Sequence, residues 1–90
     1  MKEEDLLGDP QAVARKIVHY LIEYPDAKDT IEGILRWWLR GEPGRELVQE
    51  ALDLLVSRGW MIRRDAPSSK SIYWMNRERL GDIEAYLREL

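Results

Sequence analysis

Basic side chains gather around one turn in the last third of the chain. Between positions 58 and 71 there are four cations and only one acid, Asp65. The cations are Arg58, Arg63, Arg64 and Lys70. Positive charge on a projecting segment is what contact with a phosphate backbone requires. The other interpretation is that these charges only keep the edge of a β-hairpin soluble, and the residues alone leave both open.

No set of residues has the composition of a catalytic or metal site. His19 is the only histidine, and Glu23 follows it one helical turn later. Two ligands are too few for a metal site, so we expect His19 to be a partly exposed helix residue. The chain has no cysteine and no glycine-rich phosphate-binding loop. The residues that nucleophilic catalysis and nucleotide binding would need are therefore missing. We expect neither an enzyme nor a cofactor.

Length and charge fit one small cytoplasmic domain over residues 1–90. The 90 residues suffice for one core, and no run approaches the roughly 18 apolar residues of a membrane span. The acidic start MKEEDLL is unlike a secretory signal, and residues 1–8 are expected to fray. Because the net charge is −3 at pH 7, the placement of the cations matters more for nucleic-acid binding than the total.

The first predicted helix covers residues 10–24 and is apolar on two sides. Asp9 is a typical N-cap, Pro10 suits the first helical position, and Pro25 ends the run. The two strips are Val13, Ile17, Tyr20, Leu21 and Tyr24, and Ala14, Val18 and Ile22. The second strip is expected to pack on another helix of this chain or on a second copy.

Two further helices are expected around a glycine- and proline-rich turn at residues 41–44. The segment 30–40 begins with a capping box, in which Asp29 or Thr30 combines with Glu32. Its apolar face consists of Ile31, Ile34, Leu35, Trp38 and Leu39. The next helix begins at Arg45, ends at Gly59, and buries Leu47, Val48, Ala51, Leu52, Leu54 and Leu55.

After Gly59 the pattern changes from helix to strand. Residues 60–64 and 71–76 are rich in β-forming residues and enclose a turn-type segment, which predicts a β-hairpin. We expect its core-facing residues to be Trp60, Ile62, Ile72 and Trp74, although Tyr73 and Met75 make the opposite pleat apolar as well. Asn76 can then cap a closing helix over residues 77–90, with Leu80, Ile83, Leu87 and Leu90 on one face.

The order of these elements resembles the winged-helix family of helix-turn-helix domains. The resemblance covers roughly residues 10–76, and the run LLVSRGWMI looks like the family's join from the recognition helix into the wing. It implies an α+β, mainly helical fold with a three-helix core, a β-hairpin wing and a C-terminal helix.

The resemblance also implies duplex DNA as a partner and a role in transcription regulation. In that family the third helix commonly enters the major groove, and the wing touches the DNA backbone. Carried onto this chain, the residues nearest the bases would be Arg45 and Gln49, and those on phosphates Arg63, Arg64 and Lys70. One such module makes few contacts, so useful affinity would need a homodimer that reads two half-sites.

The exposed side of the third helix departs from this pattern. It carries Glu46, Glu50 and Asp53, which repel phosphates. Winged helices without a basic recognition helix are often protein-interaction modules. The second hypothesis is therefore a protein partner bound by this acidic helix and the region of Trp37. Tyr86, on the closing helix, is a further candidate for a partner or homodimer interface.

The adjacent tryptophans need separate explanations, because neighbouring helical side chains point about 100° apart. Trp38 belongs to the apolar face of its helix and is expected in the core. Trp37 either packs beneath the hairpin or the closing helix, anchors a partner protein, or stacks on a nucleic-acid base. The first use is favoured, since the chain has no Phe and its four Trp and four Tyr must supply all aromatic packing.

Overall fold

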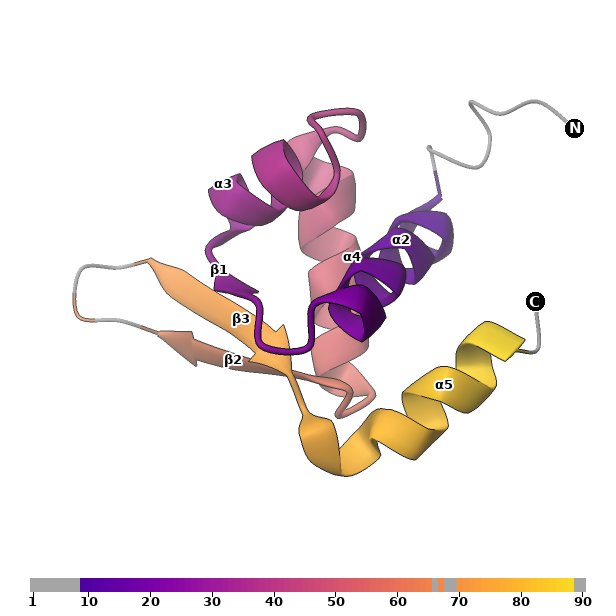
Figure 1. The fold of residues 1–90 in the computed structure, drawn as a ribbon. Helices are drawn as coiled ribbons and strands as arrows, with labels where there is room; N and C mark the ends of the chain where they lie inside the picture. The colour runs from indigo at the N-terminus through magenta and orange to yellow at the C-terminus, as the bar shows by residue number, and fades with distance from the viewer. Residues whose placement is uncertain (1–8, 66, 68–69, 89–90) are drawn as a thin grey trace, which may run out of the picture.

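The computed structural model describes residues 9–65, 67 and 70–88, which form an α+β, mainly helical structure (Figure 1). The acidic segment 1–8 and Leu90 lie outside the described residues. The elements are α2 (Pro10–Glu23), β1 (Lys28–Asp29), α3 (Ile31–Gly33), η1 (Ile34–Trp38), α4 (Arg45–Ser57), β2 (Met61–Asp65), β3 (Ser71–Met75), η2 (Arg77–Arg79) and α5 (Leu80–Arg88). In the described part of the chain, no helix has the length and apolarity that crossing a bilayer requires.

Helix α2 begins where the sequence predicts and is covered on two sides. The Asp9 carboxylate accepts a hydrogen bond from the Gln11 backbone N–H at 3.0 Å, which confirms the predicted N-cap. Both α4 and α5 pack against this helix (Figure 1). Ala14 and Val18, from the second apolar strip, are buried in the same core as Val13. The second strip is therefore buried within this chain.

The second helical segment combines a short α-helix with a π-helical turn. Thr30 is the N-cap of α3, and its hydroxyl accepts a hydrogen bond from the Gly33 N–H at 3.3 Å. Glu32 does not close the predicted capping box: the Thr30 N–H donates to the Asp29 carboxylate, and the carboxylate of Glu32 binds Arg45. From Ile34 the helix widens to the π form of η1, which the period of the apolar residues does not predict.

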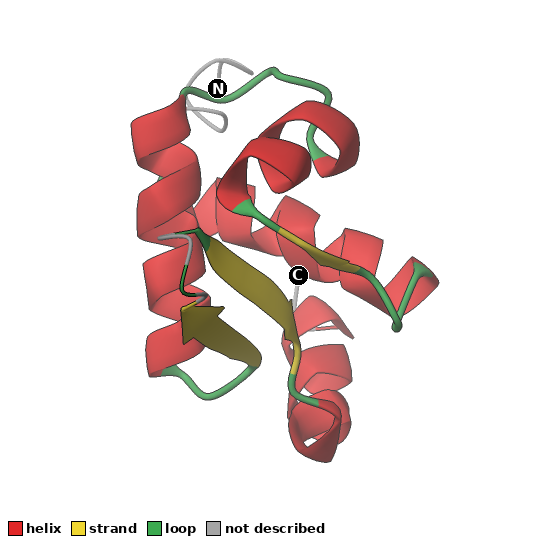
Figure 2. Cartoon of the chain, turned by 90° about the vertical axis from the view of Figure 1, so that its left-hand side faces the viewer, coloured by secondary structure: helices red, strands yellow, loops and turns green. Residues whose placement is uncertain are grey.

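The three strands form an antiparallel sheet in the order β1–β3–β2 (Figure 2). The β2–β3 hairpin is predicted, whereas β1 is not. The expected pleat of the hairpin is wrong: Met61, Tyr73 and Met75 are buried, and Ile62 is 37% exposed. Met61 opens β2 facing the core, and side chains alternate along a strand, so Ile62 must point outwards.

The chain closes with a capped helix that covers one side of α2. The Asn76 carboxamide accepts a hydrogen bond from the Glu78 N–H at 3.2 Å, as predicted for the cap. In α5, Ile83 is buried and Leu87 is half-buried, whereas Leu80 is exposed. Trp60 is partly buried and packs against the core, and its ring lies against Tyr86 of α5, with centroids 4.9 Å apart.

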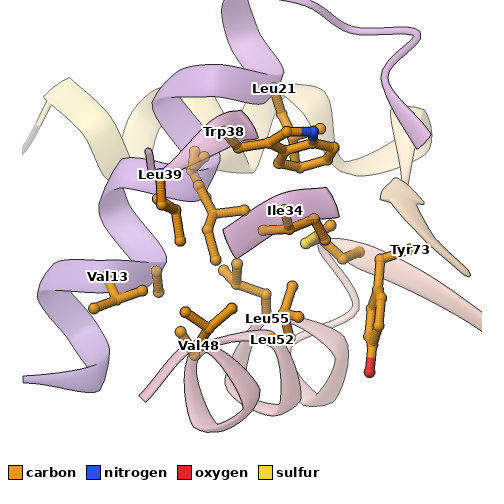
Figure 3. Close-up of a cluster of buried hydrophobic side chains, with 14 of the residues drawn as sticks. Val13, Leu21, Ile34, Trp38, Leu39, Val48, Leu52, Leu55 and Tyr73 are labelled. Atoms are coloured by element: carbon orange, nitrogen blue, oxygen red, sulfur yellow. The ribbon is translucent and has the colours of Figure 1, made fainter. Parts of the chain in front are cut away.

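The hydrophobic core lies where α2, η1, α4 and the sheet meet (Figure 3). Each of these elements contributes side chains, and those labelled in Figure 3 are Val13, Leu21, Ile34, Trp38, Leu39, Val48, Leu52, Leu55 and Tyr73. This core fixes the α3–η1 segment beside α4, which determines the surfaces described below.

Candidate functional site

The residues predicted to contact DNA lie on α4 and on the β2–β3 hairpin. They are Arg45 and Gln49 in α4, Arg63 and Arg64 in β2, and Lys70 directly before β3. Arg45, Gln49 and Arg63 line one hollow of about 160 Å³. Arg64, the next residue along β2, points to the opposite face of the sheet from Arg63. The structure thus brings three of the five residues together.

Arg45 is held by an acid from the neighbouring helical segment. Its guanidinium forms an ion pair and a hydrogen bond with the carboxylate of Glu32, and both side chains are exposed. The hydrogen bond from Arg45 keeps the pKa of Glu32 below its ordinary value, and the charge of Lys70 adds to this effect. Much of the positive charge of Arg45 is therefore balanced before any ligand binds.

Arg63 is engaged in the same way within the hairpin. Its Nε donates a hydrogen bond to Oδ1 of Asp65 at 2.9 Å, and the Ser71 hydroxyl donates to the same oxygen at 2.6 Å. The Ser71 hydroxyl and the Arg63 guanidinium lower the pKa of Asp65, and the carboxylate raises the pKa of Arg63. The hairpin therefore carries a compensated pair where a phosphate clamp is predicted.

The exposed side of α4 is acidic. Gln49 already donates from Nε2 to Asp53 at 3.1 Å and to the Tyr73 hydroxyl at 3.3 Å. Glu46 and Glu50 are exposed on this helix, as is Asp53. A phosphate backbone approaching α4 would meet these three carboxylates, which repel it.

Arg64 and Lys70 are the two charged residues among the predicted contacts that no acid of the described residues binds directly. Both are exposed, and neither forms an ion pair with an acid in the described part of the chain. They are the remaining candidates for phosphate contact on the hairpin.

The two adjacent tryptophans have opposite environments. Trp38 is 9% exposed and belongs to the core, as predicted. Trp37 is 68% exposed, so the favoured prediction that it packs beneath the hairpin or the closing helix is wrong. The turns of η1 direct Trp38 inwards, and the preceding side chain cannot share that direction. Contact with a partner and stacking on a base remain for Trp37.

A second hollow, of about 230 Å³, lies at the end of η1. It is lined by Glu32, Leu35, Arg36, Arg40 and Gly41. Arg36 and Arg40 are not among the predicted contact residues. Their positions on either side of the two tryptophans in the sequence are the signal that could have identified them. Arg40 has a φ of 58°, in the left-handed region.

Tyr86 is half-buried in α5. The Arg58 guanidinium lies 5.2 Å from the centroid of the Trp60 ring and 5.7 Å from that of Tyr86. The three side chains contribute to one hollow of about 380 Å³ at the surface. The role of Tyr86 in a partner or homodimer interface stays a prediction.

The histidine–glutamate pair considered as a metal site lies on α2. His19 and Glu23 are exposed on α2, and no three His, Asp or Glu side chains of the described residues are grouped as a metal ion would require. Comparisons with models of known protein families, with curated proteins and with solved structures found no match to the chain.

Proposed function

We propose that this chain is a winged-helix domain that binds a protein partner through Trp37. The element order from α2 to β3 and the sheet order β1–β3–β2 support the winged-helix assignment. The partner contact rests on one observation, the 68% exposure of Trp37 beside a buried Trp38. Tryptophan is enriched among the residues that dominate binding energy at protein interfaces.

The charge distribution favours a protein over duplex DNA. The helix that would enter the major groove exposes Glu46, Glu50 and Asp53. Arg45, at the start of this helix, and Arg63, on the hairpin, are already bound by acids of the same chain. Polar groups of both signs are ordinary at protein interfaces, whereas a phosphate backbone requires an excess of cations.

Paired affinity capture tests this function. Wild type, Trp37→Ala and the control Arg88→Ala would each be immobilised, and proteins retained from an extract of the source cells would be identified by mass spectrometry. We expect a partner that wild type and the Arg88→Ala variant retain and that the Trp37→Ala variant does not. An unchanged set of proteins on folded Trp37→Ala would contradict the role of Trp37.

Duplex DNA binding is the second candidate function. It is favoured by Arg64 and Lys70, which form no ion pair among the described residues. Its test is a salt titration of binding to a short mixed-sequence duplex, with wild type against the triple variant Arg63→Ala, Arg64→Ala and Lys70→Ala. If these residues clamp phosphates, the slope of log K against log salt falls by about 0.9 for each phosphate that the variant no longer neutralises. Absence of binding at low salt for both proteins would exclude this function.

A further inference from the structure

Two of the three hollows described above, those of about 160 and 230 Å³, share Glu32 as a lining residue. We name this pair of adjoining hollows the Glu32 groove; it is lined by Thr30, Ile31, Glu32, Leu35, Arg36, Arg40, Gly41, Arg45, Gln49, Arg63, Ser71 and Tyr73. We propose that it binds an acidic segment of a partner protein, which inserts one apolar side chain beside Leu35. This site is separate from the contact assigned to Trp37 and does not depend on it.

The charges that line the groove fit carboxylates. Arg36 and Arg40 are exposed and form no ion pair with an acid among the described residues. Glu32 is the one acid among the described lining residues, and Arg45 already binds it. A guanidinium can bind a carboxylate through two parallel hydrogen bonds. Aspartate or glutamate side chains of a partner would therefore complement Arg36 and Arg40.

Leu35 provides the apolar part of the groove. It is half-buried and packs against the core, so its position is fixed by the fold. The hollow beside it, about 230 Å³, is smaller than the clefts of roughly 300–1,000 Å³ that hold small molecules. Its size and the leucine among its lining residues suit a single apolar side chain.

Arg40 holds its position at a conformational cost. Among the described residues it is the only non-glycine residue with a positive φ, 58°, and Gly41 follows with a φ of 72°. An L-residue in this region is strained because its Cβ crowds the following carbonyl oxygen, and glycine avoids that strain. Backbone strain of this kind is concentrated at ligand contacts. Arg40 is one of the residues that line the hollow, where a carboxylate could bind its guanidinium.

An acidic peptide fits the groove better than a nucleic acid. Glu46 and Glu50 continue the exposed side of α4 beyond Arg45 and would repel successive phosphates. Leu35 offers an apolar contact that a phosphate backbone cannot use. A peptide can place a carboxylate and an apolar side chain next to each other, which matches a hollow lined by Leu35 together with Arg36 and Arg40.

Selection from a random peptide library displayed on phage tests the proposal. The targets would be wild type, the double variant Arg36→Glu with Arg40→Glu, and Trp37→Ala as a matched control outside the groove. We expect wild type and the Trp37→Ala variant to select the same acidic peptides with one apolar residue. The double variant should bind a selected peptide about tenfold more weakly in fluorescence anisotropy, since two exposed charge pairs become repulsive.

Each other outcome overturns the acidic-segment proposal. These outcomes are selection of neutral or basic peptides, equal binding by the double variant, or no peptide selected by wild type. Displacement of a selected peptide by a single-stranded oligonucleotide would assign the groove to nucleic acid instead. Arg40→Gly is a second variant, in which glycine adopts the positive φ without strain and folding is therefore not at risk. It should still weaken peptide binding, because the guanidinium is lost. If the selected peptides bind wild type and the double variant but not the Trp37→Ala variant, they contact Trp37, and the groove proposal is overturned.

Discussion

The ring of Trp38 lies parallel to the ring of Tyr20, with centroids 4.7 Å apart and 9° between the planes. This stacked pair joins η1 to α2, and the ring of Tyr24 follows at 4.7 Å from Tyr20. Trp37, one residue earlier, is directed to solvent. The two tryptophans therefore have different roles: Trp38 holds the second helical segment on the core, and Trp37 is available for a contact.

Removing the two indoles should have very different effects on stability. Trp38→Ala should lower the free energy of unfolding by about 3–5 kcal/mol, since it removes a buried ring and leaves a cavity. Trp37→Ala should change it by no more than about 0.5 kcal/mol, as is usual at an exposed position. Urea unfolding followed by circular dichroism measures both. If Trp38→Ala does not fold, Trp38→Phe should lower the free energy of unfolding by a smaller, measurable amount. Equal losses for the two alanine variants would contradict the assignment.

Arg40 and Gly41 are adjacent residues with positive φ, so opposite substitutions at the two positions measure the cost of a left-handed backbone. Arg40→Gly should raise the free energy of unfolding by about 1 kcal/mol, because glycine adopts a φ of 58° without strain. Gly41→Ala should lower it by about 1 kcal/mol at a φ of 72°, although a Cβ there would meet no atom within 4 Å. Denaturant midpoints at constant slope would measure both changes. A destabilised Arg40→Gly would mean that the arginine side chain stabilises the turn by more than its backbone costs.

The helix boundaries could be predicted because their signals are local. Asp9 before Pro10, and Asn76 after β3, place a side-chain acceptor where a free helical N–H requires one. The register of the hairpin could not be predicted, since both pleats are apolar and only the path from Gly59, with its φ of 78°, into Met61 decides which faces the core.

Strand β1 could not be predicted for a different reason. Its two residues, Lys28 and Asp29, are poor strand formers, and they become a strand only because β3 lies beside them, with Lys28 opposite Trp74. The same limit applies to the candidate site. Four of the five predicted DNA contacts are exposed as expected and Gln49 is half-buried, but the pairing of Arg45 with Glu32, 13 residues earlier, depends on the packing of α3 against α4.

Gly33 is required by a close approach within the fold. A Cβ at this position would lie 1.8 Å from Oδ1 of Asp29, the oxygen that accepts a hydrogen bond from the Thr30 N–H at 2.8 Å. Gly33→Ala should therefore lower the free energy of unfolding by about 1–3 kcal/mol, the usual cost of overpacking, although alanine is the better helix former. Gly81→Ala, on α5 with open space around it, should instead stabilise by about 0.5–1 kcal/mol. Thermal unfolding of the two variants measures the contrast. Stabilisation by both would show that Asp29 moves aside freely.

The Asp65 carboxylate should make the hairpin sensitive to acid. Its pKa in the folded chain is lowered by the Ser71 hydroxyl and the Arg63 guanidinium, whereas the unfolded value is about 3.9. A lowered folded pKa stabilises the folded state above the unfolded value, and this contribution is lost as the pH falls through the folded value. Asp65→Asn should therefore be less stable than wild type at pH 7, with the difference shrinking below about pH 4.

Urea unfolding at neutral and acidic pH, with a carbon-13 NMR titration of the carboxyl group, would measure this effect. Glu50→Gln is the control, because Glu50 is exposed on α4 and its carboxylate has no hydrogen-bond partner among the described residues. Both side chains of the Arg63–Asp65 pair are exposed, so the effect should also weaken as salt screens the charges. A stability difference that stays constant from neutral to acidic pH would show that Asp65 contributes through its shape and not through its charge. The pair with Arg63 would then leave that arginine available for a ligand.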